Sequence, residues 1–260
     1  MLTILILGLC VGIILGLTGA GGGILAIPAL MFSQNWSVAQ AAPIGLLAVT
    51  SAAIVGAVEG FIRKQVRYRA AIWIALMGIP MTPLGLYAAQ LLPAHWLMTA
   101  FAITMLIVAS RLLIPTANNE TYHPCNLNPD TGRLIWTPIT IVILGGIGIL
   151  TGFLTGLLGV GGGFVLVPAL RKATNISMHG IVATSLMVIA LVGSSGIITS
   201  LIQGHIFPLD VALPFIIACI IGMFSGRQLI NRIKAQTVQR VFALFVIGIA
   251  LFMLFKAQHA

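Results

Sequence analysis

The chain has 260 residues, of which 59% are hydrophobic and only 7% are charged, and its formal net charge is +9. Soluble domains carry about 25% charged residues, so this composition excludes an ordinary soluble domain and predicts a protein of the lipid bilayer. The cations are scattered between apolar stretches and form no continuous patch, which argues against nucleic acid as a partner. We interpret them as signals of membrane topology.

Hydrophobic segments follow one another along the chain, four in each half. Most are near or above the length of ~20 apolar residues that crosses a bilayer core. They run roughly over residues 2–32, 38–60, 70–92, 96–114, 135–170, 178–202, 207–226 and 238–255. The stretch between the halves is rich in Asn, Pro, Asp and Gly, which is typical of a loop. The sequence therefore predicts an all-α polytopic membrane protein with a first membrane repeat over 1–114, an inter-repeat loop over 115–134 and a second repeat over 135–260.

The same glycine-rich phrase occurs in both halves, 140 positions apart. Residues 16–30 read GLTGAGGGILAIPAL, residues 156–170 read GLLGVGGGFVLVPAL, and nine of the 15 aligned positions are identical. Three consecutive glycines disfavour a continuous helix, because each Gly costs about 1 kcal/mol relative to Ala. Helices interrupted at corresponding places of two membrane repeats are typical of transporters and mark their binding sites. We therefore expect each repeat to open with a Gly-broken helix.

The two expected breaks predict a binding site for a small anion. Unwound backbone at membrane depth is tolerated only inside protein or beside a water-filled cavity, and a helix that resumes there presents a partial positive charge. Such helix ends would bind an anion without any buried Lys or Arg. The alternative is that the glycines only allow close helix packing. The candidate ligands are the backbone groups of Gly19, Gly21, Gly22, Gly23, Gly159, Gly161, Gly162 and Gly163.

The distribution of Lys and Arg distinguishes two topologies. If all eight segments cross the membrane, the cations divide seven against six between its two sides. If the first segment of each half instead turns back at its glycines, each half crosses three times, the halves are inverted, and the cations divide twelve against one. Cytoplasmic loops carry an excess of Lys and Arg, so the inverted repeat is favoured, and it places both termini outside the cytoplasm.

The doubled phrase, Gly-x-x-Gly-x-Gly-Gly-Gly followed by an apolar run and Pro, resembles the TauE/SafE family of sulfite exporter-like transporters. The resemblance covers nearly the whole chain. It implies a carrier of the cell (inner) membrane that moves sulfite, sulfonates or related small anions without ATP. The second half also resembles the family at residues 183–186 (ATSL), whereas the first half departs there with APIG at residues 42–45, which removes one hydroxyl pair from the expected two-fold site.

A few polar side chains in the predicted spans are further candidates. Thr184 and Ser185 are the best side-chain ligands, because a hydroxyl donates to an anion without the cost of burying a charge; alternatively they bond the preceding helical turn. Glu59 either takes part in proton coupling or forms an i,i+4 ion pair with Arg63 at the membrane surface. The prolines of the PMTP stretch at residues 80–83 are expected to distort the third span, as a hinge or as a static kink.

Taken together, these features favour a secondary transporter that exports sulfite, a sulfonate or a related organosulfur anion by alternating access around a midplane site. A passive anion channel and a membrane subunit of a larger transport complex are the alternatives. An enzyme is not expected, because the chain has four acids and lacks the H-E-x-x-H and G-x-S-x-G motifs. No cofactor is expected, and no metal, because no His/Cys spacing suits zinc. The expected partners are a small anionic substrate and lipid, and a homo-oligomer is left open.

Overall fold

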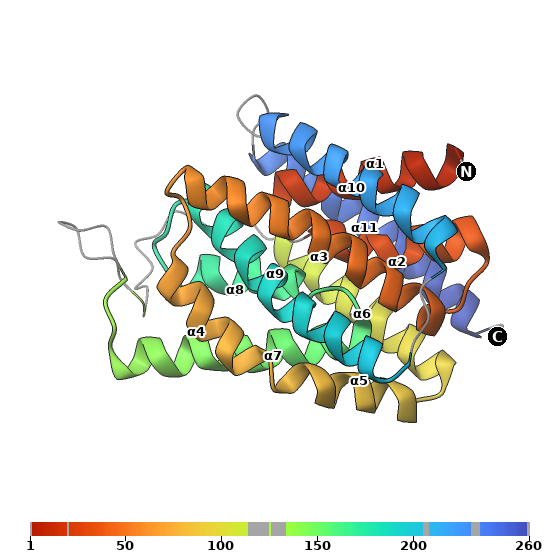
Figure 1. Cartoon of the computed structure of the whole chain (residues 1–260), viewed down its shortest axis with the longest axis horizontal. Helices are drawn as coiled ribbons and strands as arrows, with labels where there is room; N and C mark the ends of the chain where they lie inside the picture. Colours follow the sequence, from red (N-terminus) through yellow and green to blue (C-terminus); the bar gives the residue numbers. More distant parts are fainter. Residues whose placement is uncertain are drawn as a thin grey trace.

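The computed structural model describes residues 2–19, 21–113, 125, 134–204, 208–229 and 235–258. Every regular element in this part of the chain is an α-helix, which confirms the predicted all-α class (Figure 1). The helices are α1 (Leu2–Thr18), α2 (Gly21–Gln34), α3 (Val38–Ile62), α4 (Tyr68–Gly78), α5 (Met81–Leu91), α6 (Ala94–Leu113), α7 (Pro138–Leu158), α8 (Gly163–Ala173), α9 (Met178–Ile202), α10 (Leu209–Leu229) and α11 (Ala235–Gln258). Of the loop predicted over 115–134, the structure describes only Cys125, whose N–H donates to the carbonyl of Ala173 at 3.0 Å, and Leu134.

Four helices, α3, α7, α9 and α10, are long and apolar enough to cross a bilayer. The pair α4 and α5 forms a fifth candidate span, which is bent by 42° between its two helices. The bend lies at Pro80, which has no N–H to continue the helical hydrogen bonds. Shorter apolar helices, including α1 and α2, complete the bundle. By length and composition, the chain is a multi-pass membrane protein.

Each glycine-rich phrase lies where one helix ends and the next begins. α1 ends at Thr18 and α2 begins at Gly21, while α7 ends at Leu158 and α8 begins at Gly163. Left-handed backbone angles occur at Gly19 (φ 72°), Gly159 (φ 67°), Gly161 (φ 79°) and Gly162 (φ 59°). Glycine adopts these angles without the steric cost that other residues meet. The sequence therefore permits a sharp change of direction at both places.

Beyond each turn the two helices pack against each other. Gly22 lies against Val11 and Leu15 of α1, and Gly162 lies against Thr151 and Thr155 of α7. Figure 1 shows α1 and α2 at the end of the bundle that holds both chain termini, whereas α7 begins at the opposite end. The two helical hairpins thus enter the bundle from opposite ends.

The first helix of each half packs against the third segment of the other half. α1 contacts α10 and α7 contacts α4 and α5, while α3 packs against α9 in the centre and α6 against α11. Glycines allow these close approaches: a Cβ at Gly12 would overlap the carbonyl of Cys219, and a Cβ at Gly152 would overlap the carbonyl of Gly78. Small residues let helices approach closely in membranes. The two interfaces therefore correspond, since Gly12 and Gly152 are 140 positions apart and their partners Cys219 and Gly78 are 141 apart.

Seven of the described cations gather at one end of the bundle. A Cβ added at Gly180, in the first turn of α9, would lie 3.5 Å from the carbonyl oxygen of Gln65. The end of α3 and the start of α9 therefore meet at this end. Trp73 of α4 and Trp136 before α7 meet edge-on near the same end, with ring centroids 6.5 Å apart. We call this the cation-rich end, and its members are Arg63, Lys64, Arg67, Arg69, Arg171, Lys172 and Arg227. The loops described at the opposite end, residues 35–37, 92–93 and 203–204, contain no Lys or Arg.

Candidate anion site

The two glycine-rich turns meet in the interior of the bundle. Gly23, in the first turn of α2, lies against the carbonyl of Val160, which precedes α8. A Cβ at position 23 would overlap that carbonyl, and both residues are buried. The structure therefore brings the two predicted halves of the site into direct contact, although they are far apart in the sequence.

Each turn also docks on one of the two central helices. A Cβ at Gly19 would lie 2.7 Å from Cγ1 of Val182 on α9, and a Cβ at Gly159 would lie 2.5 Å from Cβ of Ala42 on α3. Val182 and Ala42 are themselves 140 positions apart. These contacts support the close-packing interpretation for both glycines, and the available anion ligands there are backbone groups.

The start of α8 presents buried N–H groups. Within the described residues, no backbone carbonyl accepts a hydrogen bond from the N–H of Gly161, Gly162 or Gly163, and no side chain caps the helix. All three residues are buried. Buried backbone donors in folded proteins are nearly always paired. An anion is the partner that such a helix start favours, because the N–H groups and the helix dipole both attract negative charge.

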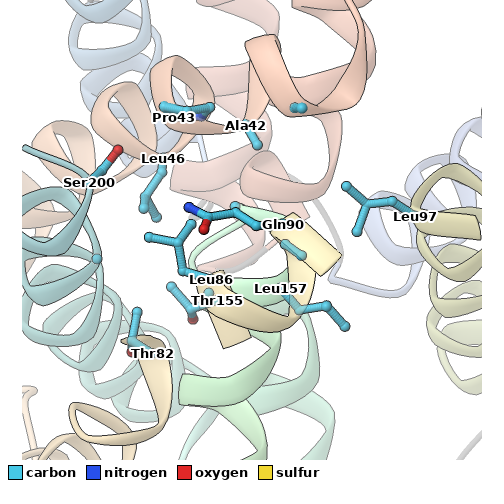
Figure 2. Close-up of a pocket in the computed structure, with 15 residues that line it drawn as sticks. Ala42, Pro43, Leu46, Thr82, Leu86, Gln90, Leu97, Thr155, Leu157 and Ser200 are labelled. Carbon is cyan, nitrogen blue, oxygen red and sulfur yellow. The ribbon is translucent and has the colours of Figure 1, made fainter. Parts of the chain in front are cut away.

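A cavity of about 100 Å³ leads toward this turn. It lies between α3, α5, α7 and α9, and Figure 2 shows Gln90 projecting among the residues that line it. Three lining residues lie near helix ends, at the end of the bundle opposite the cation-rich end: Ala39, Gln90 and Ser200. A fourth, Gly159, lies at the second glycine-rich turn. The other lining residues are Ala42, Pro43, Leu46, Thr82, Leu86, Ala89, Leu97, Thr155, Gly156, Leu157 and Gly196.

The lining of the cavity is uncharged and mostly apolar. Three of its polar side chains already donate hydrogen bonds: Thr82 to the carbonyl of Gly78, Thr155 to that of Thr151, and Gln90 to the side chain of Gln203. Ser200 differs, because its hydroxyl is buried and has no protein partner among the described residues. The Ser200 hydroxyl is therefore an unpaired donor in a residue that lines the cavity.

Thr184 and Ser185, the predicted side-chain ligands, are buried and hydrogen-bonded within the protein. The hydroxyl of Thr184 accepts a bond of 3.0 Å from the N–H of Arg67. The Ser185 hydroxyl lies 2.9 Å from the carbonyl of Gly19 and 2.8 Å from that of Val182. Ser185 thus joins α9 to the first glycine-rich turn. Neither residue lines the cavity.

Glu59 forms the expected i,i+4 ion pair, and it forms a second one that sequence reasoning missed. Its carboxylate lies 2.9 Å from Nη2 of Arg63 and 3.1 Å from Nε of Arg227 on α10. Arg227 is only 9% exposed, and it donates to the carbonyl of Gly56 and to the side chain of Gln65. Arg227 therefore supplies a buried cation one residue beyond the predicted segment 207–226.

The approach of α10 to α1 explains why Arg227 is buried. A Cβ at Gly222 would overlap the carbonyl of Leu9, and a Cβ at Gly226 would overlap that of Ile13. These contacts hold one face of α10 against α1 and leave Arg227 in contact with α3. The sequence signal for this burial was a G-x-x-x-G spacing directly before Arg227. Arg227 entered the sequence prediction only as one of the cations that indicate topology. Among the described residues, no group of three or more His, Cys, Asp or Glu side chains is placed to hold a metal ion.

Comparison with known proteins gives a consistent assignment. The family model described as sulfite exporter TauE/SafE matches residues 4–253. A probable membrane transporter protein of Xylella fastidiosa is 32% identical over 257 residues, which cover 95% of this chain and 92% of that protein. The probable membrane transporter protein YunE of Bacillus subtilis is 27% identical, with 90% of this chain and 89% of that protein covered. A search of solved structures gives no significant match.

Proposed function

The chain belongs to the sulfite exporter TauE/SafE family and is a membrane transporter; from this premise we propose that it is a secondary transporter of a small anion. The proposed substrate is sulfite, a sulfonate or a related organosulfur anion, which the protein exports across the cell (inner) membrane. The proposed mechanism is alternating access around a site at the two glycine-rich turns.

The buried N–H groups of Gly161, Gly162 and Gly163 are the observation that carries this proposal. They lie directly after Gly159, the residue at which the cavity reaches the second turn. An oxyanion accepts several such bonds at once, and the start of α8 adds a partial positive charge. The hydroxyl of Ser200 supplies a further donor in the cavity. These groups bind an anion through hydrogen bonds and the partial charge of a helix start.

The repeat architecture supports a carrier. We propose that the two halves are inverted repeats, each with a helical hairpin that turns back at its glycines and three segments that cross. The equivalent contacts of Gly12 and Gly152, and of Gly19 and Gly159, support this relation. In this arrangement both termini lie outside the cytoplasm and the cation-rich end faces the cytoplasm.

The residues equivalent to part of the cavity lining are packed together at the other end of the bundle. Gly196 lines the cavity with Leu46 and Thr82. Its counterpart 140 positions earlier, Gly56, is instead packed against Met223 and Leu186. We propose that the end with the cavity is the open end of a transport path and that Met223 fills the equivalent place at the other end, as alternating access requires of a single state.

Flux through liposomes that hold only this protein tests the proposal. Uptake of 35S-labelled sulfite is measured against its concentration, with sulfate, taurine and chloride as competitors. Saturable flux that a sulfur oxyanion inhibits supports the carrier. Flux that rises linearly with concentration, far above the turnover of carriers, supports a channel instead. Absence of flux from the purified chain contradicts a self-sufficient carrier.

A further inference from the structure

The filled end of the path carries a buried arginine that the open end lacks. Arg227 lies four residues after Met223, the side chain that packs against Gly56. At the open end, Leu86 stands four residues after Thr82, which packs in the same way against Gly196. Leu86 lines the cavity. The two ends are thus built from equivalent positions, and a guanidinium at one end replaces an isobutyl group at the other.

Only one nitrogen of the Arg227 guanidinium is paired with a negatively charged group. Its Nε pairs with the Glu59 carboxylate at 3.1 Å, whereas its Nη1 and Nη2 donate to a neutral carbonyl at 3.2 Å and a neutral amide at 3.3 Å. Charge-assisted hydrogen bonds are usually shorter, at about 2.7–2.9 Å. A planar guanidinium binds an oxyanion through two parallel N–H groups. Because Gly56 and Gln65 are neutral acceptors, an oxyanion in the place of the Glu59 carboxylate can bind Nε and also take an Nη–H of Arg227.

The surrounding cluster has a surplus of positive charge. Glu59 is shared between Arg227 and Arg63, so one carboxylate faces two guanidinium groups. The Arg63 side chain is 53% exposed, and water screens its charge, whereas the Arg227 side chain is 8% exposed. The buried cation therefore depends on Glu59, and a second anion entering the cluster is attracted rather than repelled.

The same contacts tie the two halves together. Glu59 and Gly56 belong to α3, whereas Arg227 and Met223 belong to α10. Separation of α3 from α10 at this end would take the Glu59 carboxylate away from Arg227 and leave the guanidinium without its counter-charge. An anion bound to Arg227 supplies the replacement charge, so the end opens more readily with an anion present.

From this geometry, and resting on the proposed function, we propose that Arg227 binds the transported oxyanion at the cation-rich end of the path. In the structure the Glu59 carboxylate occupies that position as an internal competitor, and together with Met223 it closes this end. The class of ligand is a small oxyanion such as the –SO3⁻ group that sulfite and sulfonates share. Exchange of Glu59 for the substrate is then the event that opens the path.

Two variants separate these roles. Arg227→Gln removes the anion ligand, so we expect the KM for sulfite to rise at least ~10-fold, with Arg227→Lys between this variant and the wild type. Glu59→Gln removes the competitor and keeps the side-chain volume, so we expect the KM for sulfite to fall by about 3-fold or more. Arg69→Gln is the matched control, because it removes a cation from the same end without touching Arg227, and its KM should stay within about 2-fold of wild type.

A binding measurement that does not need transport completes the test. Thermal stabilisation of each detergent-purified variant is recorded against sulfite concentration, with elution on size exclusion as the check of folding. We expect the half-maximal sulfite concentration to rise in Arg227→Gln and to fall in Glu59→Gln. Equal KM and equal half-maximal concentrations in the folded Glu59→Gln and Arg227→Lys variants and the wild type would overturn the inference while leaving the carrier intact. Loss of sulfite stabilisation in Arg227→Gln, with no flux in the wild type, would support the anion site and contradict the carrier.

Discussion

At the residue scale, glycines do two different things in this protein. Some allow a close approach between helices, as Gly23 does against the carbonyl of Val160. Others, such as Gly159, also adopt a backbone angle that other residues meet only with strain. The sequence cannot separate these roles, because both need the absence of a side chain. The contacts of each position separate them.

Gly23→Ala tests the contact between the two turns. The added Cβ overlaps the carbonyl of Val160, so we expect a loss of about 1–3 kcal/mol of stability together with most of the transport activity. Gly146→Ala is the control, because a Cβ there meets nothing within 4 Å. Its helix should gain about 0.5–1 kcal/mol. The measurement is thermal unfolding in detergent, and equal unfolding temperatures for the two variants would contradict the contact.

Ser200→Ala tests the free hydroxyl of the cavity. A lost hydrogen bond to a charged ligand corresponds to about a 10-fold rise in the KM for sulfite. Ser194→Ala on the same helix is the control, because that hydroxyl already donates to the carbonyl of Ala190 at 2.6 Å. The concentration dependence of liposome flux is the readout. A KM that changes equally in both variants would remove Ser200 from the site.

At the scale of elements, the bend between α4 and α5 is the clearest departure from a straight span. Pro80 lies at the start of α5, and the two helices make an angle of 42°. The opposite half has a continuous α10 at the equivalent place, although Pro214 lies within its first turns. The third segment of each half therefore packs against the first helix of the other half, but it is bent in the first half and continuous in the second.

Pro80→Ala tests whether this bend acts as a hinge. The variant restores an N–H that can continue the helix, so we expect a straighter span and a several-fold lower maximal flux with little change in KM. Pro138→Ala is the control, because Pro138 is in the first turn of α7, where the N–H has no helical partner. A maximal flux that is unchanged in both variants would make the bend a static kink.

At the scale of the whole molecule, the cation-rich end and the two helical hairpins define an axis. Seven described cations lie at one end, whereas Lys256, in the last turn of α11, lies at the other end, where Figure 1 places both chain termini. From the positive-inside rule we predict that the termini lie outside the cytoplasm.

Reporter fusions test this orientation. A fluorescent protein fused after Ala260 should stay dark, and alkaline phosphatase at the same place should be active. The internal control is a fusion after Gln65, at the cation-rich end, where the fluorescent protein should fold and fluoresce. Fluorescence from the C-terminal fusion would reverse the assignment.

The fold class and the positions of the turns could be read from the sequence because they depend on local patterns. Continuous apolar segments predict membrane helices, and three glycines in a row mark where a helix is weak. The Glu59–Arg63 pair is likewise local, at a spacing of one helical turn. The roles of the candidate side-chain ligands were harder to predict, because their hydrogen-bond partners lie far away in the chain. Ser185 meets the carbonyl of Gly19, and Thr184 meets the N–H of Arg67.

The buried arginine and the cavity could not be predicted for the same reason. The G-x-x-x-G spacing before Arg227 indicates a close helix contact but not that the partner is α1, and the guanidinium lies against α3 because of that contact. The cavity is lined from several helices, so a residue such as Ser200 acquires its free hydroxyl only when the bundle is assembled. Hydropathy orders the spans along the chain but does not pair them.

The crossed packing of the two halves also constrains how the protein is made. α1 is the first helix to leave the ribosome, but its main partner, α10, begins only at Leu209. Until then the glycine-lined face of α1 has no partner, and a chain cut within the inter-repeat segment has neither α10 for α1 nor α7 for α5. The two halves are therefore not independent modules. Each completes the other, and biogenesis must hold the N-terminal hairpin in the membrane until nearly the whole chain has been synthesised.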